Sequence, residues 1–243
     1  MTVNNGDIFQ IGNHTIGCGS SIDLSFVDKV IGDKKIRAVI TDPPYGVDYG
    51  ANTKSQVKKI IGDELQTDEV YILFTKNWLK PILSHLNDYN TFHIFNADTK
   101  FLALQQGMLA TGIYFSQMLV WIKNQPVMGR KDYLSQFEVI AYGWYGKHKL
   151  ERSKGKSVLY YPKPKKSKLH PTQKPVGLMR KIIPNVTSIG DYVYDAFLGS
   201  GTTAVACEHL GRGCIGIELD PEYVEIILLR LEKLTGKVRE KIN

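Results

Sequence analysis

The residues best suited to chemistry are a carboxylate and an aromatic ring on either side of two prolines, Asp42-Pro43-Pro44-Tyr45. They follow the apolar pair Val39-Ile40, which predicts a buried strand. Proline has a fixed φ and no N–H, so the chain must leave this strand in a stiff, extended form with free carbonyls. Asp42 and the Pro43 carbonyl would then be neighbouring acceptors for both N–H bonds of a planar exocyclic amine, with the ring of Tyr45 stacked on its heterocycle. The simpler alternative is a strand end with a proline turn and a solvated Asp.

A second stretch places acids at strand ends on either side of a glycine-rich turn. One short strand ends in Asp195, and the turn Phe197-Leu198-Gly199-Ser200-Gly201 leads into a predicted helix over Thr202–Leu210. A further strand over Cys214–Ile217 ends in Glu218. In such a unit the glycines let the backbone approach a nucleoside, and the carboxylate at the end of the next strand can accept hydrogen bonds from both ribose hydroxyls.

The glycine pattern alone fits more than one ligand. Gly199-x-Gly201-x-x-Ala204 with Glu218 also matches a nicotinamide-dinucleotide fingerprint, and an NAD-dependent dehydrogenase would need no more than this. An ATP-binding phosphate loop is disfavoured because no Lys follows Gly201. Two features favour S-adenosylmethionine: Asp195 precedes the glycines, and the Asp42 stretch prepares an amine that needs an electrophile. A plain glycine turn between strand and helix is the simplest alternative.

The net charge of +7 is unevenly distributed along the chain. Residues Gly146–Lys174 carry ten Lys or Arg against the single acid Glu151, so this segment has a charge of +9 and the rest of the chain −2. Aromatic residues, Tyr160 and Tyr161 among them, are interleaved with these bases. This combination indicates a polyanion with stackable bases as a partner, although a solvated face or a disordered loop would look similar.

Length and composition predict one domain of ordinary globular character. The chain has 243 residues, which is enough for a proper core. Its first ten residues lack the layout of a signal peptide, and no apolar run approaches the length of a membrane span. Cys18, Cys207 and Cys214 show no metal-ligand spacing, nor do the six histidines. We therefore expect no metal, and a reducing, cytoplasmic setting.

The elements that must position these residues alternate between strands and helices. Strands are predicted over residues 37–41, 91–95, 114–122, 134–142, 191–195 and 214–217, after a hairpin over 7–10 and 15–18. Helices are predicted over residues 21–31, 68–86, 99–110 and 202–210. This alternation predicts an α/β protein with a mostly parallel sheet covered on both faces. Residues 46–62 are predicted to form a mobile loop over the site, and residues 146–169, here called the basic stretch, to be an insertion.

Three motifs together resemble a known family. In chain order they are Asp42-Pro43-Pro44-Tyr45, His170-Pro171-Thr172-Gln173-Lys174-Pro175 and Phe197-Leu198-Gly199-Ser200-Gly201. They resemble the permuted (beta) class of amino-group DNA methyltransferases, in which the catalytic motif precedes the cofactor motif. The similarity spans nearly the whole chain. Gly46-Val47-Asp48-Tyr49 and Val120-Trp121-Ile122-Lys123-Asn124 are similar to compact phage and prophage members.

The resemblance implies a single methyltransferase domain over residues 1–243, with a Rossmann-like, mostly parallel sheet that contains one antiparallel strand. It implies that the basic stretch is the target-recognition region, and that Ser20 stands where relatives often have an Asp near the cofactor's adenine ring. The cofactor-binding residues are expected to be Thr172, Lys174, Asp195, Phe197, Gly199, Ser200, Gly201, Thr202 and Glu218. The DNA-binding residues are expected to be Lys147, Lys149, Arg152, Lys154, Lys156, Lys163, Lys165, Lys166 and Lys168.

The implied reaction is direct methyl transfer from S-adenosylmethionine to an exocyclic amine of a base flipped out of duplex DNA. Asp42, Pro43, Pro44 and Tyr45 would be its catalytic residues. Asp in the first motif position is more typical of adenine-modifying members, so we expect the N6 nitrogen of adenine, with the N4 nitrogen of cytosine as the alternative. A methyltransferase for RNA or for a protein amide, and a silent DNA-binding module, are further alternatives. A homodimer and a cognate restriction nuclease are partners that the resemblance leaves open.

Overall fold

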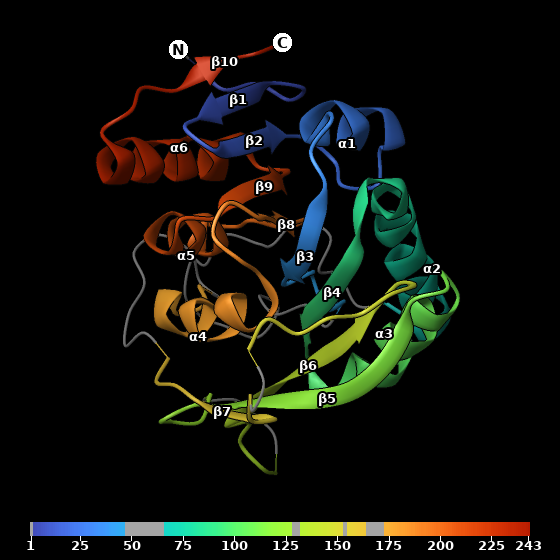
Figure 1. The fold of residues 1–243 in the computed structure, drawn as a ribbon. Helices are drawn as coiled ribbons and strands as arrows, with labels where there is room; N and C mark the ends of the chain where they lie inside the picture. Colours follow the sequence, from blue (N-terminus) through green and yellow to red (C-terminus); the bar gives the residue numbers. More distant parts are fainter. Residues whose placement is uncertain (1, 47–65, 128–131, 153–154, 164–172) are drawn as a thin grey trace.

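A computed structural model describes residues 2–46, 66–127, 132–152, 155–163 and 173–243, and builds them around one ten-stranded sheet (Figure 1). The strands are β1 (Ile8–Ile11), β2 (His14–Cys18), β3 (Ile36–Thr41), β4 (Leu86–Asn96), β5 (Tyr114–Ile122), β6 (Phe137–Trp144), β7 (Val158–Tyr160), β8 (Tyr192–Asp195), β9 (Gly213–Glu218) and β10 (Glu240–Lys241). The helices are α1 (Leu24–Ile31), α2 (Asp68–Leu79), α3 (Phe101–Leu109), α4 (Val176–Val186), α5 (Thr202–Leu210) and α6 (Pro221–Thr235), with short 3-10 helices at Lys80–His85 and Asp98–Lys100.

The strand order is β10-β1-β2-β9-β8-β3-β4-β6-β5-β7. From β2 to β4 all neighbours are parallel, whereas β6 is antiparallel to both β4 and β5. At the far side β1 pairs antiparallel with β2 and with β10. The expected α/β fold with a mostly parallel sheet is confirmed. Because β3 and β8 are parallel neighbours, the residues that follow their carboxyl ends meet at one edge of the sheet.

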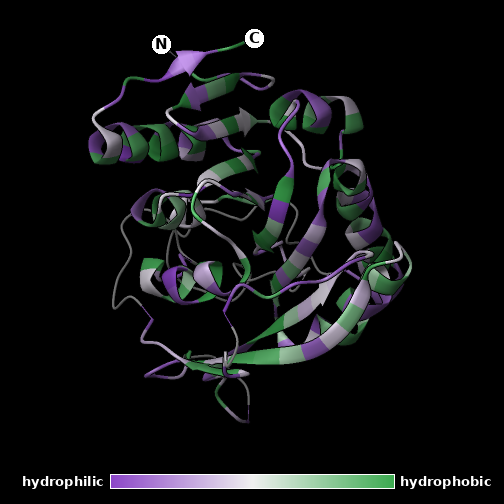
Figure 2. Ribbon diagram, viewed as in Figure 1, coloured by the Kyte–Doolittle hydropathy of each residue, from purple (hydrophilic) through white to green (hydrophobic). Residues whose placement is uncertain are grey.

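The helices cover the two faces of this sheet in two groups. Helices α4, α5 and α6 pack over one face on residues such as Ala38 and Ile40, and α1, α2 and α3 pack over the other on residues such as Val39. Each group presents apolar residues inward and polar residues outward, which gives the helices their mixed colouring in Figure 2. Within the described residues, no helix is long and apolar enough to cross a membrane.

Two helices begin or end where a local signal competes with hydrophobic periodicity. Helix α1 begins at Leu24 and not at Ser21, because the Asp23 side chain caps it by accepting from the Phe26 N–H (3.1 Å). Helix α2 ends at Leu79 and continues as a 3-10 helix that contains Pro81. Proline cannot donate to the carbonyl four residues before it, so the helix predicted to reach residue 86 stops early.

Other differences concern strands and the C-terminal half. Strand β4 begins at Leu86, five residues before the predicted start, and β6 begins at Phe137 and not at residue 134. The sequence patterns did not predict α4, α6, β7 or β10. Strand β7 lies inside the basic stretch and pairs in parallel with the second half of β5, so part of the predicted insertion belongs to the sheet. Apart from Gly46, residues 46–62 lie outside the described residues.

Candidate active site

The predicted catalytic carboxylate lies at the carboxyl end of the central strand β3. The strand ends at Thr41, and Asp42 follows directly with a side chain that is 22% exposed. Tyr45 donates its hydroxyl to Asp42 Oδ1 at 2.5 Å. Lys174 donates its ammonium to Asp42 Oδ2. Both carboxylate oxygens are therefore engaged by side chains from the first and second motifs, which the fold brings together.

Lys174 belongs to a buried series of alternating charges. Its side chain is 6% exposed, and its Nζ lies 3.1 Å from Glu138 Oε2. On the other side Lys123 Nζ lies 2.7 Å from Glu138 Oε1. The ammonium of Lys174 also lies 5.4 Å from the centre of the Phe95 ring and 5.8 Å from that of Tyr45, close enough for cation–π attraction. The series Lys123–Glu138–Lys174–Asp42 thus carries two positive and two negative groups.

Glu138 was not among the predicted site residues. A signal for it exists in the sequence, because Glu138 is the single acid in the otherwise apolar strand β6. A charge within a buried strand costs free energy unless it is paired, so such an acid indicates a nearby cation. Its partners come from distant positions in the chain, which sequence patterns cannot reveal.

The charges of the series support one another. Burial alone would raise the pKa of Glu138, but Lys174 and Lys123 outweigh it and hold that pKa below its usual value. Burial alone would lower the pKa of Lys174, yet Asp42 and Glu138 raise it above the ordinary lysine value. Burial raises the pKa of Asp42, and the Lys174 ammonium opposes that rise. Lys174 and Glu138 are therefore both charged at neutral pH.

Asp195 connects the catalytic strand to the glycine turn. Its carboxylate accepts from the Thr41 hydroxyl at 2.7 Å and from the Phe197 N–H at 3.1 Å. Burial raises the pKa of Asp195 to about 6. The Phe197 ring packs edge-on against Trp78, with ring centres 5.5 Å apart. Asp195 thus fixes the residue before Asp42 and the start of the turn relative to each other.

The glycine turn and Glu218 form the predicted nucleoside site. Gly199 and Gly201 have φ values of +53° and +78°, and a Cβ on Gly201 would lie 2.9 Å from Ile227. Glu218 Oε2 accepts from the Gly199 N–H at 2.7 Å, and its Oε1 accepts from the Asp220 N–H at 2.9 Å. Each oxygen has a further lone pair, so a ribose diol can still donate to this carboxylate. Burial raises the pKa of Glu218 to about 7.

The remaining predicted cofactor residues surround this turn. Thr202 donates its hydroxyl to the Lys174 carbonyl at 3.2 Å, and Arg230 of α6 donates to the Ser200 carbonyl. Ser20 follows β2, whose Cys18 is the register partner of Glu218. Ser20 therefore follows the strand that lies next to Glu218. Thr172 lies outside the described residues.

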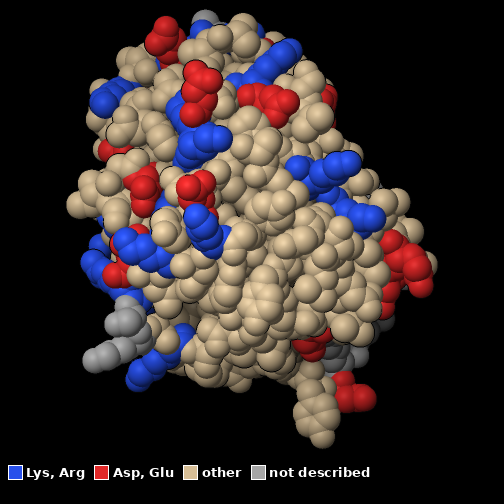
Figure 3. All heavy atoms as spheres, turned by 45° about the vertical axis from the view of Figure 1, so that its right-hand side comes forward, with Lys and Arg blue, Asp and Glu red and all other residues tan. Residues whose placement is uncertain are grey.

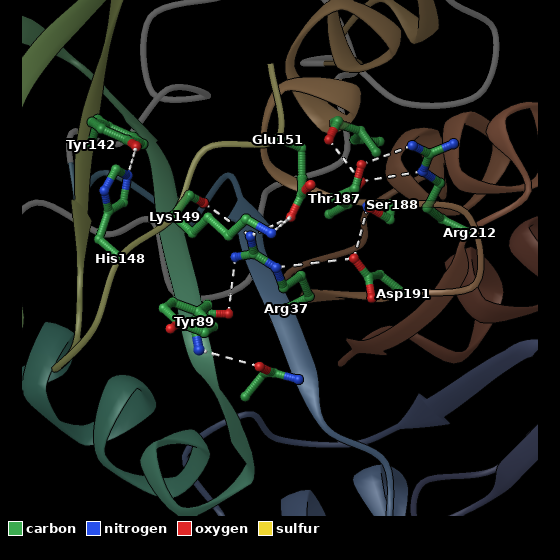
Figure 4. Close-up of polar contacts among 12 residues, drawn as sticks. Arg37, Tyr89, Tyr142, His148, Lys149, Glu151, Thr187, Ser188, Asp191 and Arg212 are labelled. Carbon is green, nitrogen blue, oxygen red and sulfur yellow. Dashed lines mark hydrogen bonds and ion pairs between the residues drawn. The ribbon is translucent and has the colours of Figure 1, made fainter. Parts of the chain in front are cut away.

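The basic stretch begins on the side of the sheet where the parallel strands start, here called the amino edge, whereas Asp42 lies where they end, here called the carboxyl or catalytic edge. Arg37, near the start of β3 and 5% exposed, donates to the Tyr89 and Lys149 carbonyls at 2.9 Å and to Glu151 at 3.0 Å (Figure 4). The Glu151 and Arg152 N–H groups both donate to the Asn185 carbonyl at the end of α4. Lys147, Lys149 and Arg152 are thus held at the amino edge, away from Asp42.

The later part of the basic stretch returns to the catalytic edge. Strand β7 pairs with Val120–Ile122 at the carboxyl end of β5, and the Lys163 N–H donates to Asn124 at 3.1 Å. Lys156 lies just before β7. The structure therefore divides the predicted DNA-binding residues between two edges. Lys154, Lys165, Lys166 and Lys168 lie outside the described residues.

The fold is that of the α/β methyltransferases: a mostly parallel sheet with β6 antiparallel, a glycine turn after β8 and a carboxylate directly after β3. A model of the DNA methylase family, the N6/N4 methyltransferases, matches residues 36–229, and the chain belongs to this family. The cofactor is S-adenosylmethionine, and the substrate is DNA. The dehydrogenase alternative is thereby excluded.

Individual relatives agree with this assignment. The chain is 29% identical to the type II methyltransferase M.HpaI of Haemophilus parainfluenzae, over 84% of this chain and 70% of the relative. It is 28% identical to M2.DpnII of Streptococcus pneumoniae, over 80% and 81% of the two chains.

Solved structures are similar in fold. The M1.HpyAVI–SAM complex is 27% identical with a TM-score of 0.66, over 88% of this chain and 98% of that one. The cytosine-N4-specific PvuII DNA methyltransferase has a TM-score of 0.72 at 18% identity, over 93% and 91% of the two chains, and shows the fold alone.

Proposed function

We propose that this protein methylates the N6 amino group of adenine in duplex DNA, as a member of the permuted class. The observation that carries the proposed methyl transfer is the hydrogen bond between Thr41 and Asp195, which links the residue before Asp42 to the acid that precedes the glycine turn. Adenine is preferred because Asp occupies the first position of the four-residue motif. The amine of cytosine fits the same acceptor, so the N4 nitrogen of cytosine is the second candidate.

The residues of the site do three things for the target amine. Asp42 and the Pro43 carbonyl accept its two N–H bonds, which favours a pyramidal nitrogen with an available lone pair. Tyr45 offers its ring to the flipped base, and stacking at about 1–3 kcal/mol offsets much of the cost of flipping. S-adenosylmethionine would supply a methyl group on its sulfonium: as the nitrogen–carbon bond forms the sulfur–carbon bond breaks, S-adenosylhomocysteine leaves, and the methylated nitrogen loses one proton to solvent. The Thr41–Asp195 link would hold the two halves of the site in place for this direct transfer, so no covalent enzyme intermediate is needed.

The cofactor site fits its ligand by geometry and by chemistry. Two glycines at positive φ bring the turn backbone close to the nucleoside, and Glu218 presents a carboxylate with free lone pairs for a ribose diol. Ser200 and Thr202 complete the turn, and Phe197 is fixed by its contact with Trp78. We assign these residues, with Lys174 next to them, to the cofactor side of the site.

The DNA contact is assigned to the part of the basic stretch that lies at the catalytic edge. Lys156 and Lys163 flank β7 there, whereas Lys147 and Lys149 follow the chain to the amino edge. The face in Figure 3 carries charges of both signs around a broad uncharged area, which does not favour a polyanion. A duplex that enters at the catalytic edge would place its target base over Asp42.

The test is to incubate unmodified DNA with the protein and labelled S-adenosylmethionine, digest the DNA to nucleosides and separate them. Label in N6-methyl-2′-deoxyadenosine is the expected result. Label in N4-methyl-2′-deoxycytidine would overturn the choice of base and leave the methyltransferase assignment unaffected. Sequencing that detects modified bases, applied to the same DNA, identifies the methylated sequence. The matched control is Asp42→Ala, which should give no label.

A further inference from the structure

Asp42, the carboxylate proposed to accept the target amine, already accepts hydrogen bonds from two side chains. Asp42 Oδ2 accepts from the Lys174 ammonium, and Asp42 Oδ1 accepts from Tyr45. A target amine needs one of these oxygens, because it donates N–H bonds just as the ammonium does. Each oxygen keeps a second lone pair, but the side chain is only 22% exposed, so an entering amine competes with these two donors for the accessible part of the carboxylate.

We propose that the Lys174 ammonium holds the place of the target amine on Asp42, and that Glu138 is the positioning residue that receives this ammonium when a base enters. The inference rests on the proposed function, since it assumes that Asp42 binds the amine.

Lys174 is the donor that can move without losing its charge partner. Its Nζ already lies 3.1 Å from Glu138 Oε2, so a small rotation of the side chain would release Asp42 and leave the ammonium with Glu138. The aromatic rings of Phe95 and Tyr45 lie 5.4 and 5.8 Å from the ammonium, so cation–π attraction also holds it at this site. Tyr45 lies farther from an alternative acceptor, with its hydroxyl 3.4 Å from Glu138.

Lys123 holds the other oxygen of Glu138. It lies 2.7 Å from Glu138 Oε1, opposite the oxygen that faces Lys174. Two cations around one carboxylate keep Glu138 ionised, in line with its lowered pKa. A neutral base adds no charge, so its entry leaves the charge balance of the series unchanged.

The experiment measures base opening and methyl transfer in the same samples. The probe is an unmethylated duplex that contains the sequence recognised by the protein. It carries 2-aminopurine beside the target base, so fluorescence rises on flipping of either adenine or cytosine. The variants are Glu138→Gln, Glu138→Asp, Lys174→Met and the double variant Lys174→Met/Glu138→Gln, at pH 8.5. Glu232→Gln, which loses an ion pair with Arg239 far from the site, is the matched control. Cofactor affinity and melting temperature are recorded for each variant.

Glu138→Gln should lower the opened fraction about tenfold at unchanged cofactor affinity, because Lys174 then has Asp42 as its one remaining acid. Glu138→Asp keeps the charge, so its opened fraction should lie between those of Glu138→Gln and the parent. Lys174→Met should raise the opened fraction, and the double variant should match Lys174→Met. The Glu232→Gln control should move the melting temperature alone.

Two outcomes would overturn the inference: a lowered opened fraction in Lys174→Met, or an effect of Glu138→Gln that persists in the Lys174→Met background. A persistent effect would mean that Glu138 acts on the base independently of the ammonium. If the parent protein opens the base but transfers no methyl group, the proposed function fails. If it does both and the double variant shows additive effects, the inference alone fails.

Discussion

The two edges of the sheet each bury a charged network, and the networks are built differently. At the carboxyl edge Lys174 bonds to two carboxylates, Asp42 and Glu138, both of which belong to side chains. At the amino edge Arg37 bonds mainly to backbone carbonyls, those of Tyr89 and Lys149, and to Glu151. A backbone carbonyl cannot turn away from its donor unless the chain moves, whereas a carboxylate side chain can rotate. The carboxyl edge can therefore change partners, and the amino edge is fixed.

The fixed edge also determines the course of the chain between β6 and β7. Arg37 holds Lys149 and Glu151 (Figure 4). The Asn185 carbonyl accepts from the Glu151 and Arg152 N–H groups. Because β3 spans six residues, Arg37 lies about 16 Å along the strand from Asp42. The same strand thus supplies a structural residue at one end and the proposed catalytic residue at the other.

Removing the acceptor gives the largest expected effect. Asp42→Ala should lower methyl transfer by at least about 1000-fold, because the amine loses its charged acceptor while the cofactor keeps its contacts to Glu218 and the glycine turn. Single-turnover methylation and calorimetric titration with S-adenosylmethionine measure the two quantities. Cofactor affinity should stay within a few-fold of the parent. Substantial remaining turnover would mean that Asp42 is not the acceptor. The carboxyl edge would then lose the function proposed for it.

The fixed network should matter for stability and not for chemistry. Arg37→Met removes the side-chain donor to the part-buried Tyr89 and Lys149 carbonyls and the nearest cation of Glu151, and should lower the free energy of unfolding by about 2 kcal/mol. Urea unfolding measures this change. Arg180→Met, at an exposed position of α4, is the matched control and should change it by about 0.5 kcal/mol or less. A selective loss of methyl transfer in Arg37→Met, at unchanged stability, would contradict the distinction between the two edges.

A third prediction concerns the pH dependence of cofactor binding. The pKa of Glu218 is raised to about 7, so the protein without cofactor gains its charged ribose acceptor as pH rises through 7. Charge-assisted hydrogen bonds are stronger than neutral ones, so affinity for S-adenosylmethionine should rise about fivefold from pH 6.5 to 8.5.

The control for that prediction is Glu218→Gln, which should bind more weakly at every pH and lose the rise. The stability of the cofactor-free protein should respond in the opposite direction. A raised carboxyl pKa means that the folded state holds this proton more tightly than the unfolded chain does, so the contribution is present at low pH and lost as pH rises through about 7. A pH-independent affinity in the parent would show that Glu218 does not accept from the ribose.

How much of this could be read from the sequence depends on how local each signal was. Asp42 and Glu218 each lie at the end of an apolar strand, and the structure places both at the carboxyl edge as expected. The end of α2 at Leu79 depends on a local proline, Pro81, that the helical periodicity concealed. Partners across the fold could not be read, since Glu138 and Lys174 meet Asp42 only after the chain has formed several further strands.

The basic stretch shows the same limit in another form. Composition identified it correctly as a concentration of positive charge. Three residues, Val158 to Tyr160, are too few for a recognisable alternation, so their pairing with β5 was not predicted. The anchor at Arg37 lies more than a hundred residues away from Lys149, and no local pattern announces it.

The smallest expected effect separates the two halves of the basic stretch. Replacing Lys163, Lys165 and Lys166 by Gln should weaken DNA binding and reduce the log–log salt slope by about 0.9 for each phosphate that the lysines no longer neutralise. Replacing Lys147 and Lys149 by Gln removes charge at the amino edge and should leave the slope nearly unchanged, because that edge faces away from Asp42. Fluorescence anisotropy measures both slopes on a duplex that contains the recognised sequence. Salt is varied between about 50 and 200 mM, a range over which counterion release changes the affinity measurably. Equal changes in the two variants would mean that DNA reaches both edges, and the amino edge would then have to be counted as part of the interface and not as a fixed support alone.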